Sequence, residues 1–389
     1  HLYGNPSSKL KIVGVTGTNG KTTTATLLFK VAKNLGYKVG LIGTVENIII
    51  DEVIPATHTT PDPIQLNRLL SKMVDKGCEY VFMEVSSHAI DQNRIAGVNF
   101  VGGVFTNLTH DHLDYHKSIE NYFLAKKKFF DFLPAQSFAL TNNDDEHGRI
   151  ILADTKAQKN TYGFSGSENF HGNIEKIDFH GIDLDVNGEK FQTHLLGKFN
   201  AYNLISVISI CKLLGFDMQK VKEILKNIEP PRGRFDHFLS DTGVLCVVDY
   251  AHTPDALQKI ISAILEIKDS NSRLISIFGC GGDRDPLKRR IMGKIGTQLS
   301  DIAILTSDNP RNEDPEKIIN EMNTDLSMSD ISKTENITDR RKAIQRAVSL
   351  AKKGDIILCA GKGHETYQEI KGVKQHFNDL EELKKAFVS

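Results

Sequence analysis

The sequence predicts an α/β protein made of two successive domains, each with a mainly parallel sheet. Short apolar runs typical of buried strands alternate with amphipathic stretches, which is the pattern of a sheet covered by helices. The chain has 389 residues, and single hydrophobic cores rarely grow beyond about 250–300 residues. Pro230 and Pro231 interrupt the helical pattern near the middle. We therefore expect domains at residues 1–230 and 231–389.

The first domain opens with a strand, a glycine-rich turn and a helix. Apolar residues predict the strand at residues 11–15, and the helix from Lys21 is expected to end at Gly36, because glycine commonly ends helices. Later elements are strands at residues 39–43, 80–85 and 101–105, antiparallel hairpins within 169–196, and helices at 199–214 and 218–228. The hairpins are expected to turn near Gly181 and Gly188.

The second domain renews the alternation in a Rossmann-like form. Its strands are expected at residues 244–248, 274–278, 302–305 and 356–358. Polar loops follow several of these strands, and ligands of open α/β sheets bind at the carboxyl ends of strands. We therefore expect functional residues in those loops.

Composition excludes several classes of protein. Hydrophobic residues make up 40% and charged residues 25%, as in ordinary globular proteins. The 48 basic and 49 acidic residues leave no net field that would favour nucleic acid or a membrane surface. The five cysteines lack CxxC pairs, which argues against zinc and disulfides, and no apolar run reaches the roughly 20 residues of a membrane helix. We expect a cytoplasmic monomer with no nucleic-acid or membrane partner.

The strongest local signal is the segment VGVTGTNGKTTT at residues 13–24. A glycine-rich turn between a strand and a helix presents backbone N–H groups that can hold phosphate oxygens. Lys21 is expected to reach the β- and γ-phosphates of ATP, and Thr22 to place its hydroxyl on Mg²⁺. The expected nucleotide loop comprises Gly17, Thr18, Asn19, Gly20, Lys21, Thr22 and Thr23. Val15 stands where the usual loop has glycine, so this loop is shorter, and a plain glycine-rich turn is the alternative.

The TGTNGKTTT loop resembles that of the Mur ligases and of their relative folylpolyglutamate synthetase. Both families use ATP to activate a carboxylate, and the resemblance continues through most of the chain. It implies a central, P-loop ATPase-like domain that binds ATP, followed by a C-terminal domain that binds an incoming amino acid.

Two polar motifs follow predicted strands of the first domain. The segment EVSSH begins at Glu84, and TNLTHDHLD at residues 106–114 holds two histidines and two aspartates, a mixture suited to a hard cation and phosphate. The family resemblance assigns magnesium to Glu84 and His112, and a carbamylated lysine to Lys126. Capping is the alternative role for Glu84, and Lys127 and Lys128 are expected to lie on a solvated face.

The same resemblance places a UDP-muramoyl dipeptide in the first domain. Its expected contacts are Thr59, Thr60, Ser86, Gln92 and Arg94. His58 departs from the asparagine of some relatives, and a Thr-Thr-Pro segment also occurs in plain turns. For ATP, the resemblance adds Asn203 at the adenine or ribose, Arg234 at the phosphates and Asp249 at the ribose, in a site between domains that needs closure.

Three loops of the second domain form the expected amino-acid site. Two arginines and a glutamate there could recognise a zwitterion, because guanidinium groups pair with carboxylates and Glu365 can accept from an ammonium. The run Asp308-Asn309-Pro310-Arg311 matches the motif of Mur ligases that add meso-diaminopimelate instead of lysine, with Arg311 holding the extra carboxylate. The expected site contains Arg284, Asp308, Asn309, Pro310, Arg311, Gly361 and Glu365, whereas a surface loop is the alternative.

The resemblance implies an ATP-dependent ligase of peptidoglycan synthesis that adds meso-diaminopimelate to UDP-muramoyl dipeptide through an acyl phosphate. Lys21, Glu84, His112 and Lys126 would carry the catalysis. A folylpolyglutamate synthetase-like ligase and a catalytically idle P-loop binding module are the alternatives. The chain departs from the family at its start, where we expect the domain that holds the uridine nucleotide to be missing.

Overall fold

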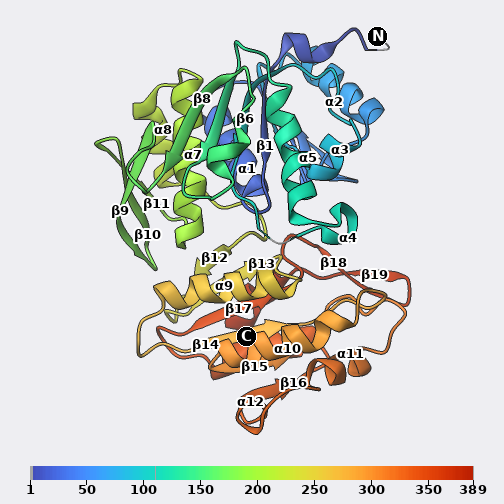
Figure 1. The fold of residues 1–389 in the computed structure, drawn as a ribbon. Coiled ribbons are helices and arrows are strands. Elements are labelled where there is room, and N and C mark those ends of the chain that lie inside the picture. Colours follow the sequence, from blue (N-terminus) through green and yellow to red (C-terminus); the bar gives the residue numbers. More distant parts are fainter. Residues whose placement is uncertain (1–2, 110, 389) are drawn as a thin grey trace. The chain divides into compact units, whose positions relative to one another are not determined.

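The computed structural model describes residues 3–109 and 111–388, and its chain divides into two compact units, His1–Glu229 and Pro230–Ser389 (Figure 1). Each unit contains its own sheet covered by helices. The predicted α/β class is therefore confirmed. No helix among the described residues is long and apolar enough to cross a membrane.

The first unit is built on an eleven-stranded sheet with the order β11-β10-β9-β8-β7-β6-β1-β5-β2-β3-β4. The strands are β1 (Lys11–Thr16), β2 (Val39–Ile42), β3 (Glu46–Ile49), β4 (Glu52–Pro55), β5 (Tyr80–Glu84), β6 (Phe100–Phe105), β7 (Phe138–Asn142), β8 (Gln158–Gly163), β9 (Phe170–Asp178), β10 (Gly181–Val186) and β11 (Glu189–Thr193). The middle of the sheet, from β2 to β9, is parallel, and antiparallel hairpins extend it at both edges. The predicted hairpins at 169–196 are confirmed, whereas the β3–β4 hairpin was not predicted.

Helices cover both faces of this sheet because β1 alternates between two cores. Val13 and Val15 pack in one core with α1 and α7, and Ile12 packs in the other with α2 and α5. The helices are η1 (Pro6–Lys9), α1 (Lys21–Asn34), α2 (Pro63–Asp75), α3 (Ser87–Asp91), α4 (Leu113–His116), α5 (Ile119–Asp131), α6 (Gly148–Ile151), α7 (Lys198–Leu213) and α8 (Met218–Lys226). Side chains of Asp62 and Ser118 accept from backbone amides at the starts of α2 and α5, which fixes where these helices begin.

The second unit contains a six-stranded sheet with the order β12-β13-β17-β14-β15-β16, in which only the edge strand β12 is antiparallel to its neighbour. Its strands are β12 (Asp236–Leu239), β13 (Leu245–Asp249), β14 (Leu274–Phe278), β15 (Ile302–Leu305), β16 (Thr334–Asn336) and β17 (Ile356–Ala360), and a separate hairpin joins β18 (Tyr367–Ile370) to β19 (Val373–His376). Its helices are α9 (Pro254–Ile267), α10 (Leu287–Leu299), α11 (Pro315–Met322), α12 (Met328–Ile331), α13 (Arg340–Leu350) and α14 (Asp379–Val388). The four predicted strands are present as β13, β14, β15 and β17, so the loops that follow them meet at one edge of the sheet.

Candidate active site

The glycine-rich loop lies between β1 and α1, as predicted. Gly17 and Gly20 have φ values of +145° and +85°, which side chains rarely adopt. A side chain on Gly17 would also meet Thr106, since an added Cβ would lie 1.9 Å from its Oγ1. Among the residues that the structure describes, no side chain caps the start of α1 at Gly20. The first amides of this helix lack intrahelical partners, and such a helix start favours an anion.

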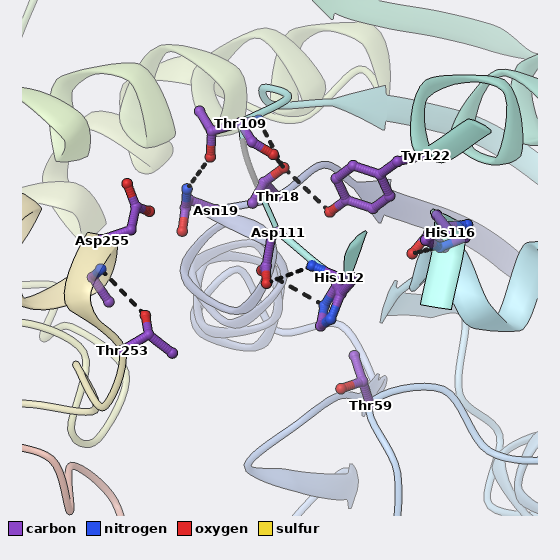
Figure 2. Close-up of polar contacts among 12 residues, drawn as sticks. Thr18, Asn19, Thr59, Thr109, Asp111, His112, His116, Tyr122, Thr253 and Asp255 are labelled. Atoms are coloured by element: carbon purple, nitrogen blue, oxygen red, sulfur yellow. Dashed lines mark hydrogen bonds and ion pairs between the residues drawn. The ribbon is translucent and has the colours of Figure 1, made fainter. Parts of the chain in front are cut away.

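The segment that follows β6 holds the loop in place (Figure 2). The Thr18 Oγ1 atom accepts from the Thr109 backbone N–H at 3.0 Å and lies 3.2 Å from the Tyr122 hydroxyl. Asn19 donates its backbone N–H to Asn107 Oδ1 at 3.0 Å. These bonds hold the loop against the segment that follows β6.

Lys21 is folded back onto its own loop. Its Nζ donates to the backbone oxygens of Gly17 at 2.9 Å and Thr18 at 2.8 Å. Thr22 and Thr23, in the first turn of α1, are both buried. For Lys21 to reach a phosphate, its ammonium must exchange these carbonyl oxygens for phosphate oxygens.

Glu84, at the carboxyl end of β5, is the buried carboxylate of this site. Its side chain accepts from the Thr22 hydroxyl at 2.9 Å, the Thr44 hydroxyl at 3.1 Å and the Thr44 backbone N–H at 2.7 Å. Glu84 is only 1% exposed. The sequence analysis missed Thr44, although it stands directly after a predicted strand. The neighbouring strands of the sheet carry their candidate residues at the same end.

Lys126 points into the protein from α5 and is 1% exposed. Its Nζ donates to the Gly17 carbonyl oxygen at 2.9 Å, the same oxygen that accepts from Lys21. Burial and the neighbouring Lys21 ammonium lower the pKa of Lys126 well below its usual range. Lys127 was expected to be solvated, which is wrong: its side chain is 13% exposed and pairs with Asp131 at 2.8 Å.

His112 lies in the loop before α4, with a φ of +53°. Its Nε2 is 3.6 Å from Asp111 Oδ2, and its ring lies 5.0 Å from that of His88 (Figure 2 shows the Asp111 contact). Among residues 3–109 and 111–388, no group of three or more His, Cys, Asp or Glu side chains could hold a metal ion. His110 of the predicted motif lies outside the described residues. Protein carboxylates and imidazoles alone therefore do not form a closed metal site in this part of the chain.

The five residues expected to bind a muramoyl dipeptide form one hydrogen-bonded network beside Glu84. The Thr60 hydroxyl donates to the Glu84 backbone oxygen at 2.8 Å and accepts from the Ser86 N–H at 3.1 Å. Arg94 donates to the Thr60 backbone oxygen at 3.0 Å and to Gln92 Oε1 at 2.9 Å. Thr59 joins through a hydroxyl contact with Thr44 at 3.0 Å. The structure thus brings together residues that are separated by up to 35 positions in the sequence.

The predicted nucleotide contacts lie in both units. Asn203 of α7 is next to the loop of the first unit, because a Cβ on Gly20 would lie 2.5 Å from its Oδ1. In the second unit, Asp249 accepts from the Phe235 N–H at 2.8 Å, and the Arg234 guanidinium lies 5.1 Å from the Tyr250 ring centre. Burial raises the pKa of Asp249, which Arg234 opposes. The Arg234 Nε is buried without a hydrogen-bond partner among the described residues.

In the second unit, the loops after β14 and β15 bring two arginines together. A Cβ built on Gly281 would lie 3.0 Å from Arg311 Nη1 and 3.7 Å from Arg284 Cγ, so both side chains flank this glycine. Arg284 is exposed, and Arg311 donates from Nη1 to the Gly282 oxygen at 2.8 Å. The Pro310 carbonyl oxygen packs against Gly282. The two loops therefore place both arginine side chains beside Gly281.

A buried charged group lies beside these arginines. Asn309 donates to Glu365 Oε2 at 2.8 Å, and Lys362, which is fully buried, donates to the same oxygen at 3.0 Å. Gly361 has no room for a side chain because a Cβ would lie 2.5 Å from Asp308 Oδ2, and burial raises the pKa of Asp308. The sequence analysis missed Lys362, although it stands between two residues that it selected. One oxygen of Glu365 is thus already held by the protein, so an ammonium group would have to share this carboxylate with Lys362.

Comparison with known proteins gives two family matches. Residues 15–211 match the Mur ligase middle domain, and residues 233–363 match the Mur ligase, glutamate ligase domain. A UDP-N-acetylmuramoyl-L-alanyl-D-glutamate–2,6-diaminopimelate ligase of Parabacteroides distasonis is 54% identical over 385 residues, which are 99% of this chain and 79% of that protein. Ligase 1 of this name from Clostridium acetobutylicum is 42% identical over 387 residues, covering 98% and 79%.

Solved structures agree with these matches. A structure of a UDP-N-acetylmuramoyl-L-alanyl-D-glutamate–2,6-diaminopimelate ligase has a TM-score of 0.73 and 34% identity, and the match covers 97% of this chain and 78% of that one. A folylpolyglutamate synthase of Thermotoga maritima shares the fold alone, with a TM-score of 0.70 and 15% identity over 92% and 87% of the two chains. The chain thus spans about four fifths of its curated relatives, and the expectation that a uridine domain is missing is not supported by these matches.

Proposed function

The chain belongs to the Mur ligase family, and from this premise we propose that it joins meso-diaminopimelate to UDP-N-acetylmuramoyl-L-alanyl-D-glutamate in an ATP-dependent reaction of peptidoglycan synthesis. The observation that carries the choice of amino acid is that Arg284 and Arg311, from two different loops, both lie next to Gly281. A diamino acid with two carboxylates needs more positive charge in its site than lysine does.

The ATP phosphates are proposed to bind the loop from Gly17 to Thr23. The support is the uncapped start of α1 at Gly20, where backbone N–H groups and the helix dipole favour an anion. Lys21 already lies within hydrogen-bonding distance of two loop carbonyls and would turn to the phosphates. Asn203 is proposed at the adenine or ribose, Arg234 at the phosphates through its unpartnered Nε, and Asp249 at the ribose.

The donor set around Glu84 fits Mg²⁺. This ion usually takes one or two carboxylates together with substrate phosphates and water, so a protein site of few ligands is sufficient. Glu84 is a buried carboxylate with the Thr22 hydroxyl at 2.9 Å, and this short distance lets both oxygens face one ion. The residues that would hold it are Thr22, Glu84, His112 and, once carbamylated, Lys126. When bound, Mg²⁺ would neutralise charge on the phosphate oxygens during transfer.

Lys126 is proposed to be carbamylated. Only a neutral amine attacks CO₂, and burial beside Lys21 favours the neutral form of Lys126. In this reaction the amine nitrogen bonds to the carbon of CO₂, one proton leaves, and a carboxylate replaces the amine. That carboxylate would stand beside the loop, since Lys126 Nζ lies 2.9 Å from the Gly17 oxygen.

The muramoyl dipeptide is proposed to bind the network of Thr59, Thr60, Ser86, Gln92 and Arg94. Hydroxyl, amide and guanidinium groups suit an acidic sugar-peptide, and Thr60 links the network to Glu84. In the second unit, Arg284, Arg311 and Asn309 are proposed to hold the carboxylates of meso-diaminopimelate, and Glu365 its ammonium. Asp308, Pro310 and Gly361 shape the same loops.

The reaction is proposed to proceed in two steps. The D-glutamate side-chain carboxylate attacks the γ-phosphorus of ATP, which gives an acyl phosphate and releases ADP. The amine of meso-diaminopimelate then attacks the acyl carbon, so that the amide forms, phosphate leaves and the amine loses a proton. Lys21 stabilises the charge of phosphoryl transfer, and the polar network orients the carboxylate.

The buried, reduced cysteines fit a cytoplasmic location.

Phosphate release tests this proposal. The protein is supplied with ATP, Mg²⁺ and the UDP-linked dipeptide, and meso-diaminopimelate is compared with L-lysine. Release that depends on meso-diaminopimelate supports the assignment, and release with L-lysine alone overturns the specificity. Release with folate and glutamate would instead indicate a folylpolyglutamate synthetase, whereas ATP binding without amino-acid-dependent release would indicate an idle binding module.

A further inference from the structure

Arg289, in the first turn of α10, is a charged side chain that the proposed reaction does not use. It is 1% exposed, which is unusual for arginine unless the charge is paired. Its Nη2 donates to Glu313 Oε1 at 2.8 Å, and its Nη1 donates to Glu313 Oε2 at 2.9 Å and to Glu321 Oε2 at 2.7 Å. One buried cation is thus shared between two carboxylates on different segments.

Glu313 connects this ion pair to the loop after β14. Its Oε1 atom accepts from the backbone N–H of Asp283 at 2.5 Å, and Arg289 Nη2 lies 3.4 Å from the Gly281 carbonyl oxygen. The hydrogen bonds from Arg289 lower the pKa of the Glu313 carboxyl to about 2. Arg289 and Glu313 therefore contact both ends of the 281–283 segment, although Glu313 itself belongs to the loop after β15.

The two loops are also joined directly to each other. Gly282 donates its N–H to the Asn309 oxygen at 2.9 Å, and Asn312 donates from Nδ2 to Asp283 Oδ2 at 2.8 Å. A Cβ on Gly282 would lie 1.9 Å from the Pro310 oxygen, so the backbones are in direct contact. Arg289 and Glu313 connect the two loops at one end of this contact. The position of Arg284 relative to Arg311 follows from the register of the two loops.

Stability alone does not explain a buried arginine with two carboxylates. Apolar replacements of buried ion pairs are often neutral or stabilising, because ion pairs lose much of their attraction to desolvation. This ion pair joins the two loops, because Glu313 belongs to the loop after β15 and also accepts from Asp283 in the loop after β14.

We propose that Arg289 is a positioning residue, which acts through Glu313 to fix the spacing of Arg284 and Arg311 and thereby the selectivity for an amino acid with a second carboxylate. This inference rests on the proposed function. Glu321 takes no part in the positioning, because it contacts Arg289 from α11 and none of its hydrogen bonds to described residues reaches either loop.

The first test measures the loops without any activity. Hydrogen exchange of the segments 279–285 and 306–313 is compared for the whole wild-type protein, Arg289→Met and Arg273→Met. Arg273 is the control, because its Nε and Nη2 both donate to Asp355 Oδ2 just before β14, at the opposite end of the same sheet. Faster exchange at Asp283 and Gly282 in Arg289→Met alone is expected, and unchanged exchange there would overturn the proposal.

The second test compares the binding of the amino acid with that of ATP, and the ratio of kcat/KM for meso-diaminopimelate to that for L-lysine is expected to fall with the former. In Arg289→Met and Glu313→Leu, the KM for meso-diaminopimelate is expected to rise about 10- to 100-fold, since small misplacements of binding groups have effects of this size. The KM for ATP should stay within about twofold, and Glu321→Gln and Arg273→Met should leave both KM values near wild type. Arg289→Lys keeps the charge and should recover part of the loss. An equal change in both KM values, or an equal effect of Glu321→Gln, would show a merely structural role.

The two proposals fail in different ways. If wild-type protein releases no phosphate with meso-diaminopimelate, the proposed function fails, and hydrogen exchange still decides whether Arg289 joins the loops. If wild-type protein is active and selective but Arg289→Met keeps its KM and its exchange pattern, only the positioning role is wrong.

Discussion

Replacement of Arg311 by methionine tests the chemistry of the proposed amino-acid site. The guanidinium donates from Nη1 to the Gly282 oxygen at 2.8 Å, and its Nε is 3.8 Å from Glu369 Oε2. An arginine has five N–H donors in a planar fork, so donors remain for a ligand carboxylate. Methionine keeps much of the side-chain volume and removes the charge. The backbone φ of +50° at this position is equally unfavourable for both residues.

The expected magnitude follows from the bonds that would be lost. A hydrogen bond to a charged group contributes about 1.5–3 kcal/mol, which corresponds to about a 10- to 150-fold change in affinity. Arg311→Met should therefore raise the KM for meso-diaminopimelate by this factor. L-Lysine lacks the second carboxylate, so its weaker reaction should change by much less. The ratio of the two kcat/KM values should fall by about 10- to 150-fold.

The assay is phosphate release at saturating ATP and dipeptide, with each amino acid varied separately. Lys371→Met is the matched control, because Lys371 is exposed, has the same φ of +50° and donates its backbone N–H to the Arg311 oxygen. This control should keep the wild-type ratio. If Arg311→Met lowers kcat/KM equally for both amino acids, the guanidinium does not read the second carboxylate and the reasoning is refuted.

Three further predictions concern the first unit. Glu84→Gln preserves shape but removes a buried charge, and phosphate release should fall by about 100-fold, whereas Glu84→Asp should retain more activity. In buffer free of CO₂, where the amine is not carbamylated, Lys126→Met should raise the free energy of unfolding in urea near neutral pH, because burial depresses the folded-state pKa and the Gly17 oxygen keeps its bond from Lys21. The unfolded lysine binds more protons, so this gain should shrink as the pH rises towards the unfolded pKa; a gain that grows would contradict the argument. Gly17→Ala should lower the melting temperature more than Gly188→Ala, since both have positive φ but only Gly17 faces an atom, Thr106 Oγ1, at 1.9 Å.

Much of the fold could be predicted because glycine and polar residues mark the ends of strands and helices. The predicted strand 302–305 has the bounds of β15, and the predicted helix from Lys21 begins at the first residue of α1. Both elements are flanked by glycine or polar residues that end apolar runs. The β3–β4 hairpin escaped prediction, because its residues 46–55 alternate polar and apolar side chains only weakly and its turn carries Asp51 without glycine.

The residues of the candidate sites also differ in whether the sequence predicts them. Residues directly after strands, such as Glu84 and Arg311, could be selected because parallel strands place their carboxyl ends at one edge. Contacts made from helices could not be selected by this rule. Arg289 stands in a run of basic residues, Lys288 to Arg290, and a basic run on a helix is usually solvated. Only the packing of α10 against α11 shows which of the three is buried.

The burial of Lys126 follows from the helical spacing of its neighbours in the sequence. Tyr122, Ala125, Lys126 and Phe129 are spaced at i, i+3, i+4 and i+7, which is one face of a helix, and all four are buried. The helical period therefore places Lys126 on the apolar face and sets Lys128 outside it. A lysine on such a face loses its hydration and is retained only where its nitrogen has a partner. The partner here is the carbonyl oxygen of Gly17, in the predicted phosphate-binding loop. The sequence contains both an apolar helix face that includes one lysine and a glycine-rich loop after a neighbouring strand. Together these two features predict a buried amine beside the phosphate site.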